Sequence, residues 1–167
     1  MILIGLGANL PSPEFGPPRA TIQRALEALE SAGVVILARS DWYSTAPVPA
    51  SDQPRYVNLV AAIGTDLAPD DLMRLLHQTE DRFGRVRGAR NAARVIDIDL
   101  LDYDGETRGS WPLLPHPRMT ERAFVLVPLR DIAPEWRDPV SGTDIDTLIA
   151  AAPDRDGVRA IDNDEAM

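Results

Sequence analysis

The chain has 167 residues and no cysteine, so disulfide bonds and thiolate chemistry are excluded. Its length suits one ordinary domain, and we expect residues 1–167 to form a single domain. The formal net charge of −9 argues against nucleic acid or an anionic membrane as a partner, because both attract a basic surface. A short apolar N-terminal run without a basic leader predicts neither a signal peptide nor a membrane span, and hence a cytoplasmic protein.

The first half of the chain is predicted to contain three strands and two helices. Residues 1–10 have the pattern of a strand that runs into a glycine-rich turn. An apolar stripe at i, i+3, i+4 and i+7 predicts an amphipathic helix within residues 17–33. Residues 34–45 and 55–65 each read as one strand. Acids in the first turn and leucines along one face predict a second helix within residues 69–84.

The second half begins with a strand at residues 94–105, "RVIDIDLLDYDG", followed by a proline-rich stretch at residues 111–119. Residues 120–134 are compatible with a short helix or a strand, because Pro128 lies inside them. An acidic tail from about Pro153 is expected to be frayed. The order β-α-β-β-α-β predicts an α+β sandwich of the ferredoxin-like type.

Two aspartates interrupt the strand at residues 94–105. Asp97 and Asp99 occupy alternate positions, so their carboxylates share one face about 6 to 7 Å apart. From there both could reach a pair of cations separated by about 3.5 to 4 Å. The alternative is a solvated outer face opposite Ile96, Ile98 and Leu100, and this is the more common reason for such a pattern. The two aspartates alone do not decide between these interpretations.

The segment just before that strand, "RVRGARNAAR", contains four arginines and no acid in an otherwise acidic protein. Arginine matches phosphate oxygens bidentately, and a polyphosphate with its Mg²⁺ needs arginines and carboxylates together. A basic helical stripe is the alternative, because Arg87, Arg90 and Arg94 fall at i, i+3 and i+7. The glycines around the segment favour a mobile loop instead. The pairing of arginines with Asp97 and Asp99 therefore favours a phosphate site.

Five further side chains are candidates for ligand contacts. His116 has a proline on each side and makes poor core material, although a lone histidine is usually structural. Glu80 falls on or beside the buried stripe of its helix, where it either faces solvent or points inward to a ligand. Tyr56 and Asn58 share one strand face and offer an aromatic platform beside an amide. Phe124 could supply a second ring, although aromatic residues on strands are more often plain packing.

These motifs resemble a known family when they are taken together. They are "GLGANL", "YSTAPV", "DQPRYVN", "EDRFGRVR", "RNAARVIDIDLL" and "LPHPRMTERAFVLVPLRDIAPEW". The sequence is similar, over nearly its whole length, to the 6-hydroxymethyl-7,8-dihydropterin pyrophosphokinases, which move the terminal pyrophosphate of ATP onto a pterin alcohol in folate biosynthesis. Each motif alone is weak, but the combination at these separations is specific. The resemblance implies a three-layer α-β-α sandwich around a mainly antiparallel sheet.

The resemblance also implies roles for individual residues. Asp97 and Asp99 would hold two Mg²⁺ ions that bridge the ATP phosphates, with Asp97 nearest the acceptor hydroxyl. Arg85 and Arg94 would stabilise charge on the transferring group. The other implied ATP contacts are Glu80, Arg87, the backbone of Ile98, His116 and Arg122. The implied pterin contacts are Gly7, the backbone of Thr45, Ala46 and Val48, and the side chains of Tyr56, Asn58 and Phe124. ATP and the pterin are the expected partners, and nothing in the sequence demands more than a monomer.

The chain departs from the family pattern in its arginine-rich loop. The stretch Asn91-Ala92-Ala93 stands where an aromatic residue and a Gly-Pro pair are frequent, and losing the ring could weaken closure over the substrates. Ala46 replaces a frequent proline, which matters less because backbone groups make those contacts. Two other hypotheses therefore stay open. One is an enzyme that is slow or acts on a different pterin alcohol, and the other is a ferredoxin-like binding module with a merely solvated acidic strand.

Overall fold

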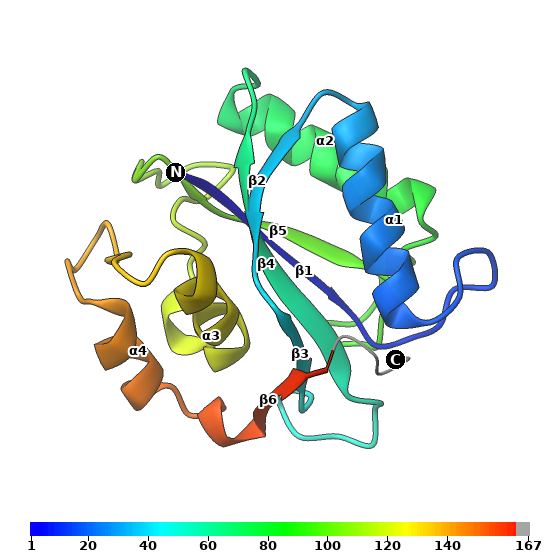
Figure 1. Ribbon diagram of the computed structural model, residues 1–167. Coiled ribbons are helices and arrows are strands. Elements are labelled where there is room, and N and C mark those ends of the chain that lie inside the picture. The colour runs from blue at the N-terminus through cyan, green and yellow to red at the C-terminus, as the bar shows by residue number, and fades with distance from the viewer. Residues whose placement is uncertain (163–167) are drawn as a thin grey trace.

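The computed structural model describes residues 1–162. A six-stranded sheet lies between two pairs of helices, with α1 and α2 on one face and α3 and α4 on the other (Figure 1). The elements in chain order are β1 (Ile2–Ala8), α1 (Pro18–Ser31), β2 (Val35–Arg39), β3 (Trp42–Thr45), β4 (Tyr56–Gly64), α2 (Pro69–Arg82), β5 (Asp97–Tyr103), η1 (Met119–Glu121), α3 (Ala123–Ile132), α4 (Ile145–Ala151), η2 (Arg155–Gly157) and β6 (Val158–Ile161).

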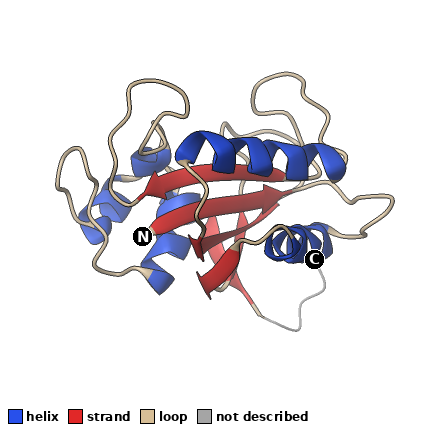
Figure 2. Cartoon of the chain, turned by 90° about the horizontal axis from the view of Figure 1, so that it is seen from above, coloured by secondary structure: helices blue, strands red, loops and turns tan. Residues whose placement is uncertain are grey.

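The sheet has the strand order β5-β1-β4-β3-β6, and β2 also pairs with β4. All of these pairings are antiparallel. Seen from above, the strands lie between the helices (Figure 2). The predicted α+β, ferredoxin-like three-layer α-β-α sandwich around a mainly antiparallel sheet is therefore confirmed.

Each face of the sheet has its own apolar core. The α1 and α2 side buries alternate strand residues such as Ile4 and Leu59 against helix residues such as Leu26 and Leu76. The opposite side is built from a separate set, in which Leu3, Val60 and Leu101 pack against Leu126 and Leu129 of α3. Because successive residues of a strand point to opposite faces, both cores use the same central strands.

Two segments differ from their predictions, and a third, residues 120–134, adopts the helix that was one of its two predicted alternatives. Residues 34–45 form two strands rather than one, because Ser40 and Asp41 interrupt the ladder and both β2 and β3 pair with β4. Residues 120–134 form the short turn η1 and then α3, in spite of Pro128. The apolar face that this helix buries outweighs the one backbone hydrogen bond that a proline removes.

The second difference concerns the C-terminal tail, which the sequence predicted to fray from about Pro153. This prediction is wrong for residues 158–161, which form β6 and pair with β3. Ile161 is buried there in the core beneath α1. The rest of the predicted tail, residues 163–167, lies outside the described residues. Within residues 1–162, no helix is long and apolar enough to cross a membrane.

Candidate functional site

A cleft of about 730 Å³ opens on the sheet face that carries α3. Its volume falls within the range typical of small-molecule sites, about 300 to 1,000 Å³. Every residue that the sequence assigned to the site lines this cleft, and these residues are Gly7, Thr45, Ala46, Val48, Tyr56, Asn58, Glu80, Arg85, Arg87, Arg94, Asp97, Ile98, Asp99, His116, Arg122 and Phe124. The fold therefore gathers four strands and three loops at one place.

The register of the sheet fixes the floor of the cleft. Gly7 of β1 pairs with Asn58 of β4 on one side and with Asp97 of β5 on the other. One step along, Gly5 pairs with Asp99. Paired residues point to the same face, so the two carboxylates and the amide project side by side into the cleft. A Cβ atom at Gly7 would collide with Asn58 Oδ1, so only glycine leaves room for that amide.

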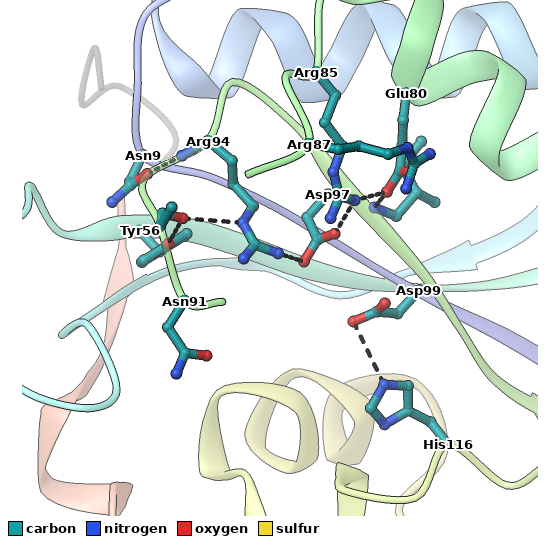
Figure 3. A network of polar contacts seen from close by, with 12 residues as sticks. Asn9, Tyr56, Glu80, Arg85, Arg87, Asn91, Arg94, Asp97, Asp99 and His116 are labelled. Carbon is teal, nitrogen blue, oxygen red and sulfur yellow. Dashed lines mark hydrogen bonds and ion pairs between the residues drawn. The ribbon is translucent and has the colours of Figure 1, made fainter. Parts of the chain in front are cut away.

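Asp97 lies between two arginines at the centre of the cleft (Figure 3). Its Oδ1 pairs with Arg85 Nη1, and its Oδ2 lies 2.6 Å from Arg94 Nη1. All three side chains are partly buried, which strengthens their attraction relative to an exposed ion pair. The loop that carries the arginines thus folds back onto β5, as the proposed phosphate site requires.

Glu80 joins the same network from the end of α2 (Figure 3). Its side chain is 1% exposed and accepts hydrogen bonds from Arg85 Nη1 and from Ile98 N at 2.7 Å. Arg87 Nη2 lies 3.3 Å from the second carboxylate oxygen. Burial raises the pKa of Glu80 to about 7, against the opposing effects of the Ile98 N–H and Arg85. Glu80 therefore points inward and does not face solvent, which was one of the two orientations that the sequence left open.

His116 approaches Asp99 from the loop before η1, with its Nε2 3.9 Å from Asp99 Oδ2 (Figure 3). Its Nδ1 accepts a hydrogen bond from Arg118 N at 3.2 Å, so the neutral ring carries its hydrogen on Nε2. Burial, reinforced by the charges of Arg122 and Arg118, lowers the pKa of His116 to about 4. The ring is therefore a neutral donor that faces the acidic side of the cleft.

The carboxylate pair fits a Mg²⁺ site that a phosphate substrate completes. Burial and the charge of Asp97 raise the pKa of Asp99 to about 6, so a cation beside both carboxylates would relieve an unfavourable charge. Within residues 1–162, no group of three or more histidine, cysteine or acidic side chains is arranged to hold a metal ion. Mg²⁺ is usually bound through one or two carboxylates plus substrate phosphates. The residues present match that pattern.

The other half of the cleft has the features of a slot for a flat polar ring. Asn58 Nδ2 donates a 2.6 Å hydrogen bond to Thr45 Oγ1, which fixes the amide with its Oδ1 toward Gly7. Tyr56 donates from its hydroxyl to Ala92 O at 3.3 Å. Phe124 comes from the first turn of α3. Aromatic rings and one oriented amide on a common cleft are suited to a heterocycle that both stacks and hydrogen-bonds.

Sequence reasoning missed the residues that hold the arginine loop. Asn9 is buried, and its Nδ2 donates to Gln53 Oε1 at 3.2 Å and Pro54 O at 3.0 Å while its Oδ1 accepts from Arg94 N at 2.9 Å. Gln53 Nε2 donates to Asn91 O at 2.9 Å. In the sequence, Asn9 indicated only the glycine-rich turn after the first strand. Its long-range partners leave no periodic pattern in the sequence.

Arginines and paired carboxylates in one cleft, above an antiparallel sheet covered on both faces, are typical of an enzyme that transfers a phosphate-containing group. Comparison with protein families narrows this class. The model of the family described as 7,8-dihydro-6-hydroxymethylpterin-pyrophosphokinase (HPPK) matches residues 3–134. The chain belongs to this family.

Individual relatives agree with that assignment. The 2-amino-4-hydroxy-6-hydroxymethyldihydropteridine pyrophosphokinase of Pseudomonas aeruginosa is 43% identical over 155 residues, which cover 91% of each chain. The protein of the same name from Synechocystis is 37% identical over 88% of this chain and 73% of the relative. A crystal structure of an HPPK-DHPS protein in complex with substrates superposes with a TM-score of 0.70 at 12% identity. That match covers 95% of this chain and 46% of the other, and it concerns the fold alone.

Proposed function

We propose that the protein transfers the pyrophosphoryl group of ATP to the hydroxymethyl group of 6-hydroxymethyl-7,8-dihydropterin, giving AMP and the pterin diphosphate in folate biosynthesis. Membership of the HPPK family supports the reaction. The observation that carries the assignment to this cleft is the shared rung of the sheet, on which Asp97, Gly7 and Asn58 lie side by side. This rung joins a half of the cleft suited to phosphates to a half suited to a flat ring.

The chemistry follows from positioning and charge. The hydroxymethyl oxygen attacks the β-phosphorus of ATP, the bond to the oxygen that bridges the α- and β-phosphates breaks, and the hydroxyl proton leaves to solvent. Asp97 and Asp99 would hold two Mg²⁺ ions, which would supply neutralisation of the charge on the phosphate chain. Arg85 and Arg94, which pair with Asp97, would take up charge that develops on the bridging oxygen as AMP leaves.

The other candidate residues bind and orient the two substrates. Glu80 and the backbone of Ile98 are proposed to contact the nucleoside, and Arg87, Arg122 and the neutral His116 the phosphates. The pterin would stack between Tyr56 and Phe124, and its hydrogen-bonding edge would meet Asn58 and the backbone of Thr45 to Val48, with Gly7 close by. Holding both reactants in one cleft would supply much of the rate acceleration expected for such a transfer.

The test is an assay of AMP release from ATP that requires both the pterin and Mg²⁺. Pterin-dependent AMP formation is expected, and its absence with folded protein would contradict the proposed function. A slow rate with this pterin and a faster one with a related pterin alcohol would favour the alternative prompted by Asn91. Thermal unfolding distinguishes the enzyme from a ferredoxin-like binding module. Mg²⁺ with a non-hydrolysable ATP analogue should raise the Tm of the enzyme but not that of such a module.

We further propose that residues 1–167 act as one domain, as a monomer and in the cytoplasm. The two apolar cores share the strands of a single sheet, which supports the first point. Light scattering coupled to size-exclusion chromatography should give the mass of one 18.3 kDa chain. A dimer at micromolar concentration would contradict the monomer.

A further inference from the structure

The C-terminal segment contacts two parts of the heterocycle half of the cleft, namely the start of α3 and the loop that begins at Ala46. After α4 the chain passes the start of α3 and then runs alongside β3 as β6 (Figure 1). This segment, residues 153–161, lies beyond residues 3–134, which the family model matches. Pro153 itself lines the cleft. The segment is thus in a position to shape the substrate slot in a way that the family motifs do not record.

On one wall, Asp154 caps α3. The N-cap residue of α3, Arg122, makes no side-chain capping hydrogen bond. The Asp154 carboxylate accepts instead from Ala123 N at 2.8 Å and from Phe124 N at 3.4 Å. The first N–H groups of a helix have no partner within the helix, and a carboxylate there is favourable for both hydrogen bonding and the helix dipole. The backbone of Phe124, the proposed stacking residue, is therefore held by Asp154.

At the edge of the slot, Gly157 holds the start of the loop that follows β3. Its carbonyl oxygen accepts from Ala46 N at 3.2 Å and from Arg55 Nη2 at 2.7 Å. Arg55 Nε donates in turn to Ser44 Oγ at 2.8 Å. A Cβ at Gly157 would lie 3.2 Å from Ala46 Cβ, so the two backbones are in close contact. The loop proposed to contact the pterin edge is thus tied to the C-terminal segment.

One short turn connects the two attachments. Gly157 N donates to Asp154 O at 3.0 Å across η2, so the two residues cannot move far independently. We propose that Asp154 is a positioning residue for the heterocyclic substrate, and that the turn 154–157 fixes the separation between Phe124 and the loop that begins at Ala46. This inference rests on the proposed function, because it takes the slot to be the pterin site.

Steady-state kinetics of Asp154→Ala and Asp154→Asn would test the proposal. For Asp154→Ala we expect the KM for the pterin to rise about fivefold or more, because the start of α3, which carries Phe124, loses the carboxylate that holds its backbone. The KM for ATP and kcat should stay within about twofold of wild type. Asp154→Asn keeps the oxygen that accepts from Ala123 N, and it should give an intermediate KM for the pterin. The matched control is Asp156→Ala, because that side chain is 98% exposed on the same turn.

A variant at Arg55, which contacts Gly157, allows the proposal to be tested even if Asp154→Ala fails to fold. Arg55→Ala removes the hydrogen bond to Gly157 O and should raise the KM for the pterin in the same selective way. An unchanged KM for the pterin in folded Asp154 and Arg55 variants would overturn the proposal. A parallel rise in the KM values for the pterin and for ATP, together with a lower Tm, would also overturn it, because it would show a purely structural role. Wild-type protein that releases no AMP would defeat the proposed function instead.

Discussion

Asp97 is the residue on which the charge balance of the cleft depends. Its carboxylate pairs with both Arg85 and Arg94, and Glu80 supplies a second carboxylate to Arg85. When phosphate and metal bind, these side chains would therefore exchange one charged partner for another. Such an exchange costs less desolvation than bringing an unpaired charge into a partly buried cleft.

Replacing Asp97 with alanine should abolish most turnover and leave pterin binding nearly intact. The change removes one proposed metal ligand and the anchor of both arginines, while the heterocycle half of the cleft keeps its contacts. We expect kcat to fall by about 10²–10³-fold or more, in line with the loss of major charge stabilisation in a transition state. AMP release and calorimetric binding of the pterin measure the two effects. Asp71→Ala on the exposed face of α2 is the control, and wild-type-like AMP formation by Asp97→Ala would contradict the assignment.

His116 should remain neutral throughout the physiological pH range. Its pKa is lowered to about 4, so nitrogen NMR should show Nε2 protonated and Nδ1 unprotonated from pH 8 down to about pH 5. An unfolded histidine takes up its proton near pH 6.5. Between pH 6.5 and 4 the unfolded state thus binds more protons, and His116 lowers the stability of the fold as pH falls through that window. Titration of His116 near pH 6.5 would contradict this prediction.

At the scale of elements, sequence reasoning correctly preferred a loop over a helix for the arginine-rich segment but did not predict the contacts of that loop. The alternation of Asp97 and Asp99 predicted a shared face, and the register of β5 on β1 confirms it. The loop itself was predicted to be mobile on account of its glycines. The structure anchors it through Asn9 and Gln53, and places Asn91 at a φ of 59° that asparagine tolerates better than most residues. Contacts between loops depend on the whole fold, so local patterns cannot predict them.

Asn9→Ala should loosen this loop and slow the reaction. The variant loses hydrogen bonds to Gln53, Pro54 and Arg94 from a side chain that is 2% exposed, which should cost about 1–3 kcal/mol of unfolding free energy. Faster hydrogen exchange at residues 85–94 and a lower kcat are the expected results. Gln23→Ala on the exposed side of α1 is the control. Unchanged exchange in the loop of Asn9→Ala would show that other contacts hold it.

For the whole molecule, the sequence predicted the class of fold but not how the chain ends. The order of strands and helices was enough for an α+β sandwich of the ferredoxin-like type, and the resemblance to the family added its three layers. The C-terminal acids gave a polar composition that suggested fraying. Strand β6 is short, and its stability comes from pairing with β3, which no local pattern in residues 158–161 indicates.

Ile161→Ala should measure how much this last strand contributes. Ile161 is buried against the core beneath α1, and truncating a buried isoleucine to alanine typically costs about 2–5 kcal/mol. Urea unfolding should therefore show a clearly lower midpoint with a similar m-value. Val140→Ala, at a side chain that is largely exposed, should change the midpoint little. Equal midpoints for the two variants would mean that β6 is dispensable for stability.

The rung formed by Asp97, Gly7 and Asn58 has one more consequence. Neighbouring strands lie about 4.8 Å apart, so two strand spacings set roughly 9.6 Å between the backbones of Asp97 and Asn58. The hydrogen bonds of the sheet maintain that interval, which separates the proposed phosphate half of the cleft from the proposed heterocycle half. A substitution in the arginine loop, such as one at Asn91, can alter how tightly either substrate is held. The strand spacing would stay the same, so such a substitution would change affinity while the two halves of the cleft keep their separation.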